Sequence, residues 1–157
     1  MGYKPLFAMT CTVFLSIGTA AVRAGETIND TGILVCATDK WDEKEVQKGH
    51  KLVDATSRCV LIPDEATAKK VTEACAGKYE YQPDGSWKAK GTCTDSYPGG
   101  DKIFLNWEEG SHLKEYPYVK TGGTGKYQGV SGGGTYFYEN LTDTLSAGRY
   151  NGKIVLP

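Results

Sequence analysis

The chain has 157 residues, of which 39% are hydrophobic and 24% charged. Its 18 basic and 19 acidic residues give a net charge of −1, which excludes the basic surface that nucleic acids or anionic membranes attract. This length suffices for one domain with a single core and leaves no room for a second.

An apolar segment opens the chain. Lys4 precedes an uncharged stretch over residues 6–22, and Val22 and Ala24 place small side chains at both positions that a signal peptidase recognises. The stretch is interrupted by threonine, serine and glycine and is too short for a typical transmembrane helix. We therefore predict a signal peptide over residues 1–24, export to the periplasm or the medium, and no stable membrane insertion of the remaining domain, residues 25–157.

Four cysteines remain after removal of the signal peptide: Cys36, Cys59, Cys75 and Cys93. An even number in an oxidising compartment predicts two disulfides. The spacing contains no Cys-x-x-Cys pair, which argues against a zinc knuckle and against a thioredoxin-type redox site. Of the three connectivities we favour Cys59 with Cys75, closing the segment between them, and Cys36 with Cys93 across neighbouring strands.

The first half of the mature chain mixes strand and helix signals. Residues 33–36 and 59–62 are short β-prone runs, whereas the charged segment 41–50 is typical of an exposed loop or a short surface helix. Residues 64–75 have a helix-favouring composition, with an aspartate at the N-cap position and a glycine just after the end. This segment is predicted to be the one short helix of an otherwise all-β chain.

From Lys78 onward, apolar and polar residues alternate with the period of two that β-strands require. Turn residues at 83–85, 98–101 and 109–111 separate these runs at the spacing of an antiparallel meander that closes into a barrel or a sandwich. We expect about eight strands in total. Those after Lys78 are predicted at residues 79–81, 87–93, 103–107, 113–121, 135–139, 145–150 and 153–156.

Seven glycines lie within residues 122–134, but interleaved aromatic and aliphatic residues argue against a flexible linker. The pair Gly125-Lys126 superficially suggests a phosphate-binding loop. Such a loop requires serine or threonine after the lysine and a glycine five residues before the second glycine, whereas Tyr127 and Lys120 occupy these places. The segment is therefore predicted to form tight turns and coiled strands.

The glycine-punctuated run over 121–136, with Gly152 and Pro157 downstream, resembles a hairpin of the allene oxide cyclase and dirigent β-barrel superfamily. Residues 91–94 and 99–105 also resemble small exported bacterial proteins of uncharacterised function with that barrel. The resemblance implies an eight-stranded, antiparallel, closed barrel with a central cavity. It carries no catalytic residue across, because the segments that hold the cyclase carboxylate and the dirigent radical-coupling pocket have no identifiable counterpart here.

Aromatic residues recur at strand spacing and are expected to share one face as a ligand-binding lining. These are Trp87, Trp107, Tyr116, Tyr118, Tyr136 and Tyr138. The acidic pair Glu108 and Glu109 follows Trp107, and only one of two adjacent strand residues can face inward. An inward carboxyl would have a raised pKa, which makes Glu108 and Glu109 the candidates for a general acid.

These patterns favour an exported barrel that binds a small apolar or aromatic ligand without catalysis. One alternative is an isomerase or cyclase of the allene oxide cyclase type. A second alternative is a structural or protein-interaction barrel with a solid interior, whose charged loop 41–51 meets a partner. His50 and His112 lie beside charged or turn residues, so no metal site is predicted, and no cofactor is indicated.

Overall fold

The structure, a computed structural model, describes residues 25–157. The predicted signal peptide, residues 1–24, lies outside the described residues. The described chain forms eight β-strands and one 3-10 turn. These are β1 (Thr27–Gln47), β2 (His50–Pro63), β3 (Val71–Tyr81), β4 (Trp87–Ser96), β5 (Lys102–Gly110), β6 (Tyr116–Gly123), η1 (Gly125–Tyr127), β7 (Ser131–Asn140) and β8 (Leu145–Val155).

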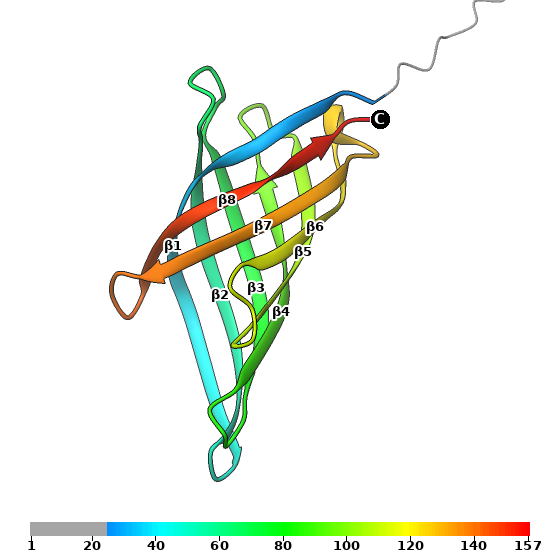
Figure 1. Ribbon diagram of the computed structural model, residues 1–157. Coiled ribbons are helices and arrows are strands. Elements are labelled where there is room, and N and C mark those ends of the chain that lie inside the picture. Colours follow the sequence, from blue (N-terminus) through cyan, green and yellow to red (C-terminus); the bar gives the residue numbers. More distant parts are fainter. Residues whose placement is uncertain (1–24) are drawn as a thin grey trace, which may run out of the picture.

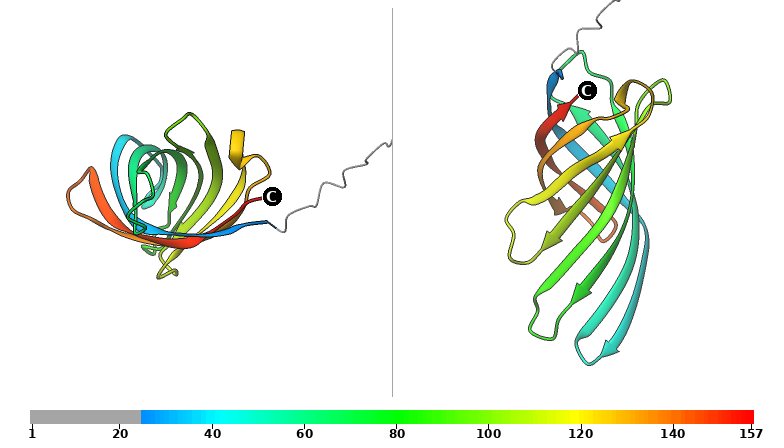
Figure 2. Two further views of the ribbon diagram at one scale, coloured as in Figure 1. Left: turned by 90° about the horizontal axis from the view of Figure 1, so that it is seen from above. Right: turned by 90° about the vertical axis from the view of Figure 1, so that its right-hand side faces the viewer.

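The strands form a closed antiparallel barrel, as predicted. Each strand pairs with the next one along the chain, and β8 pairs with β1 to complete the ring. Figure 1 shows this up-and-down order, and Figure 2 shows the strands arranged around a central interior. Closure leaves no exposed sheet edge along the paired segments. No helix within residues 25–157 is long and apolar enough to cross a membrane.

The predicted loop or surface helix at residues 41–50 is wrong, because β1 continues through this segment to Gln47 and turns at Gly49 into β2. This hairpin reaches far from the C-terminus (Figure 1). Its side chains are mostly exposed, and Glu43 forms an ion pair with Lys51 of the facing strand at 2.7 Å. The high charge therefore reflects a strand pair solvated on its outer surface rather than an absence of strand structure.

The predicted helix at residues 64–75 is also wrong. Residues 64–70 form turns, and β3 begins at Val71. Within this strand Glu73 and Cys75 line the barrel interior, while Thr72 and Ala74 face outward. Pairing with β2 and β4 outweighs the modest helix propensity of the segment. The only helical turn in residues 25–157 is η1.

Two disulfides are present, as predicted, but the favoured pairing is wrong. The bonds join Cys36 to Cys59 and Cys75 to Cys93, with Cα–Cα distances of 4.0 and 4.1 Å. Each bond links residues that face each other directly on neighbouring strands, β1–β2 and β3–β4. Cys59 faces Glu73 rather than Cys75 in the β2–β3 register. Cys36 and Cys93 lie on strands that are not neighbours.

One end of the barrel is filled by a small core. Ile103, Tyr127, Val130 and Ile154 pack together next to η1, close to the chain termini. The glycine-rich segment allows this packing through tight turns, as expected: Gly129 has a φ of 79°. We call this end the floor of the barrel.

Candidate functional site

The barrel interior holds a cavity of about 720 Å³ that is lined by residues from all eight strands. This volume lies within the range of pockets that bind drug-sized molecules. The cavity extends to the exposed β7–β8 turn through Asp143 and Thr144, at the end opposite the floor. We call that end the mouth.

All six aromatic residues predicted from strand spacing line this cavity: Trp87, Trp107, Tyr116, Tyr118, Tyr136 and Tyr138. Their rings are in contact distance, with centroids 6.2 Å apart for Trp87 and Tyr116 and 5.5 Å apart for Tyr116 and Tyr136. Trp41, Tyr79 and Tyr81 also line the cavity. Trp41 is not among the residues predicted to line the cavity, because its charged segment has the composition of a loop.

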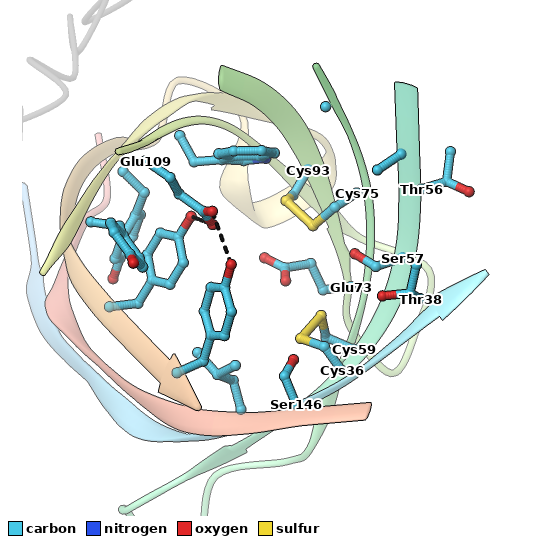
Figure 3. A pocket seen from close by; sticks show the side chains of 18 of the residues that line it. Cys36, Thr38, Thr56, Ser57, Cys59, Glu73, Cys75, Cys93, Glu109 and Ser146 are labelled. Atoms are coloured by element: carbon cyan, nitrogen blue, oxygen red, sulfur yellow. Dashed lines mark hydrogen bonds between the residues drawn. A yellow bond between two sulfur atoms is a disulfide. The ribbon is translucent and has the colours of Figure 1, made fainter. Parts of the chain in front are cut away.

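Glu109 faces the cavity, whereas Glu108 is exposed on the outer surface, so only one of the pair points inward as strand geometry requires. The Glu109 side chain is 5% exposed. Its two oxygens accept hydrogen bonds from the hydroxyl groups of Tyr136 at 2.6 Å and Tyr138 at 3.0 Å (Figure 3). Burial raises the pKa of Glu109, and these hydrogen bonds partly oppose the rise because they stabilise the carboxylate.

A second group of acidic residues lies toward the floor. Glu73 on β3 faces Asp95 on β4, and Asp95 Oδ1 is buried without a hydrogen-bond partner among the described residues. Figure 3 shows Glu73 directed into the interior near the two disulfides. Asp95 is only 1% exposed. Burial raises the pKa of Asp95 to about 6. Burial also raises the pKa of Glu73 well above its usual value, and the neighbouring Asp95 carboxyl group adds to this effect.

An ion pair completes the floor of the cavity. The Lys120 ammonium lies 2.8 Å from a carboxylate oxygen of Asp30, and Tyr118 donates a hydrogen bond to the same oxygen at 3.2 Å. The Lys120 side chain is 2% exposed. These polar residues were missed in the sequence, although alternation gives a signal: Asp95 lies two positions after Cys93, and Lys120 two positions after Tyr118.

The residues around Glu73 do not form a metal centre. Cys59, Glu73 and Cys75 place one potential ligand atom each within 4.8 Å of the others. Both sulfur atoms are disulfide-bonded, and metal binding by cysteine requires the free thiolate. His50 lies at the start of β2 and contacts Glu80 at 3.1 Å rather than standing free in a loop.

The buried carboxyl pair predicts a pH dependence of stability. Because the folded chain binds the Asp95 proton more tightly than the unfolded chain, the resulting stabilisation is present below about pH 4 and is lost as pH rises to about 6. A pKa change from 3.8 to about 6 corresponds to roughly 3 kcal/mol. Urea unfolding between pH 4 and 7 is expected to show this loss in the wild type and a flatter profile in Asp95→Asn. Glu108→Gln, an exposed residue, is the control and should follow the wild-type profile. If Asp95→Asn also follows the wild-type profile, the assignment to Asp95 is wrong.

No protein-family model matches the sequence, and no curated protein matches it significantly. Solved structures do match. The pterocarpan synthase dirigent protein PsPTS1 is 13% identical, with a TM-score of 0.53 over 83% of this chain and 96% of that chain. The pterocarpan synthase dirigent protein GePTS1 is 11% identical, with a TM-score of 0.56 over 84% of this chain and 91% of that chain. The chain has a dirigent-like barrel fold.

This result confirms the fold that the glycine-rich hairpin indicated. The match spans most of the chain, so the dirigent-like barrel accounts for the whole described domain rather than for one hairpin. At 11–13% identity the likeness concerns the fold, and no residue role is carried across. The chemistry of this dirigent-like barrel therefore has to be argued from its own cavity.

Proposed function

We propose that this dirigent-like barrel is an exported binding protein that encloses a small, largely apolar or aromatic molecule without transforming it. The observation that carries the proposal is the cavity of about 720 Å³ with aromatic rings on its walls. Large apolar surface with a few placed polar groups is typical of small-molecule sites. Two disulfides are consistent with export. The alternative of a structural or protein-interaction barrel assumed an interior filled by side chains, which does not agree with this cavity.

The proposal predicts that blocking the cavity abolishes binding. Ser57 lines the cavity, so Ser57→Trp is expected to weaken the affinity for small aromatic molecules by at least roughly tenfold, or about 1.4 kcal/mol. Val60 lies on the same strand with its side chain exposed, which makes Val60→Trp the matched control with unchanged affinity. Native mass spectrometry with a panel of phenols, aromatic alcohols and short lipids measures the bound fraction. A wild-type protein that binds none of the panel and co-purifies with no molecule would refute the proposal.

One observation favours the isomerase or cyclase alternative. Raised pKa values at Glu109 and at the Glu73–Asp95 pair place carboxyl groups suited to proton transfer inside the cavity. Both Glu109 oxygens already accept hydrogen bonds, so the pair is the better proton donor. Mass spectrometry of the ligand recovered after incubation separates the two functions. A binding protein returns the molecule unchanged, whereas an isomerase returns a product that Glu73→Gln no longer forms.

A further inference from the structure

The charges that line the cavity are unbalanced. Among residues 25–157, five carboxyl-bearing residues and a single amine line it, and no arginine or histidine does so. They are Asp30, Glu73, Asp95, Glu109, Asp143 and Lys120. The amine is paired with Asp30 at the floor, so it does not neutralise the remaining carboxyl groups. A low-dielectric cavity with charges of one sign concentrates ligands of the opposite sign.

Glu109 is a buried carboxylate that forms no ion pair with a cation of the described residues. None of the ion pairs formed within residues 25–157 includes Glu109, and its hydrogen-bond partners are neutral tyrosines. Because Tyr136 and Tyr138 each donate to a different oxygen, both oxygens act as acceptors, which is the pattern of an ionised group. Buried carboxylates are normally paired with a cation, so this charge lacks its usual counterpart.

Aromatic rings surround the same end of the cavity. We define the aromatic rim as Trp41, Tyr79, Tyr81, Trp87, Tyr116 and Tyr138, all of which line the cavity. Neighbouring rings form a continuous series, with centroid distances of 5.1 Å for Trp41 and Tyr79 and 5.7 Å for Tyr116 and Tyr138. Aromatic faces attract organic cations, and cages of tyrosine and tryptophan are a known way to bind quaternary ammonium groups.

We propose that the ligand is an organic cation, an amine or quaternary ammonium group on an apolar body, with its charged nitrogen held by Glu109 and the aromatic rim. This inference deepens the proposed function and rests on it. An inorganic cation suits the site less well, because hard cations are bound by several oxygen ligands and the two Glu109 oxygens already accept hydrogen bonds. The apolar body would lie deeper, against Leu105 and the disulfides.

The test compares molecules that differ only in charge. Phenethylamine is paired with 2-phenylethanol, and choline with 3,3-dimethylbutan-1-ol, in calorimetric titrations at pH 7.5. The wild type is expected to bind each cation at least roughly tenfold more tightly than its neutral partner. Glu109→Gln keeps the side-chain size and is expected to abolish the preference for each cation over its neutral partner. Glu108→Gln, on the outer face of the same strand, is the matched control and should retain the preference.

Each contrary result has a distinct meaning. If the neutral partners bind the wild type as well as the cations do, the ligand is not a cation and the inference is wrong, while the proposed function stands. If the preference survives Glu109→Gln but is lost in Asp95→Asn, the charge is recognised at the floor, and the assignment to Glu109 is wrong. If neither pair nor the neutral panel binds, the proposed function itself fails. The wild-type comparison requires no variant, so a misfolded Glu109→Gln protein would not prevent a decision.

Discussion

Replacing Trp107 with alanine is expected to lower the free energy of unfolding by about 3–5 kcal/mol. The Trp107 side chain is buried and belongs to the cluster that contains Ala89, Cys93 and Leu105. Its indole ring also covers two glycines on neighbouring strands. A Cβ atom at Gly77 or at Gly91 would lie 2.4 Å from the ring, so the ring occupies the space that side chains would otherwise fill. Without the ring, the space over both glycines loses the side chain that fills it.

Urea unfolding monitored by circular dichroism measures this loss. Phe104→Ala is the matched control, because Phe104 lies on the same strand and is 38% exposed on the outer surface. We expect the control to cost much less than the Trp107 substitution, since more than a third of Phe104 is already in contact with water, whereas Trp107 is 6% exposed. Equal losses for the two variants would show that Trp107 is not part of the packed wall.

Removing both disulfides is expected to lower the free energy of unfolding by about 6 kcal/mol. The bonds close chain segments with sequence separations of 23 and 18 residues, and loops of this size contribute about 3 kcal/mol each. The paired variants Cys36→Ala/Cys59→Ala and Cys75→Ala/Cys93→Ala are each expected to show about half of the loss in denaturant unfolding.

Alkylation of the unfolded, unreduced variants tests the pairing itself. A mature variant, residues 25–157, that lacks Cys36 and Cys59 is expected to contain no free thiol, because Cys75 and Cys93 remain bonded to each other and Cys11 lies outside this segment. If Cys59 paired with Cys75 and Cys36 with Cys93, the same variant would leave two cysteines without their partners. Two labelled thiols would therefore contradict the structure.

The inward side chains could be predicted from the sequence wherever the strand itself was recognised. The period of two depends only on the backbone of a single strand, so it placed Trp87, Trp107 and Tyr136 on one face without knowledge of the neighbouring strands. The same argument correctly limited the Glu108–Glu109 pair to one inward carboxyl group. Identifying Glu109 as the inward residue requires knowing which alternate residues of β5 face the interior. The burial of Ile103 and Leu105 shows that the odd-numbered residues do so.

Features that depend on two strands could not be predicted. The disulfide partners follow from registers in which Cys36 faces Cys59 and Cys75 faces Cys93, and a register is set by several strand pairs together. The helix predicted at residues 64–75 failed for a related reason, since the cross-strand partners of β3 outweigh local composition. The charged β1–β2 hairpin also depends on its pairing, because residues 41–50 alone have the composition of a loop.

Alternation alone indicates that Asp95 and Lys120 share a face with Cys93 and Tyr118, but it does not show which polar groups meet inside the barrel. Glu73 and Asp95 are separated by 22 positions in the chain and come together only through the β3–β4 pairing. The two carboxyl groups are therefore neighbours only in the folded barrel. Glu109 was identified because it follows Trp107, but its two tyrosine partners lie on β7 and could not be assigned.

Nuclear Overhauser effects between protein and ligand show whether the proposed ligand lies inside the aromatic interior of the barrel. In a sample with labelled aromatic rings and unlabelled phenethylamine, we predict contacts from the ligand to Tyr79, Tyr116 and Tyr138, which line the cavity. Contacts confined to Phe104 and Phe137, whose rings are exposed on the outer surface, would contradict this placement of the ligand.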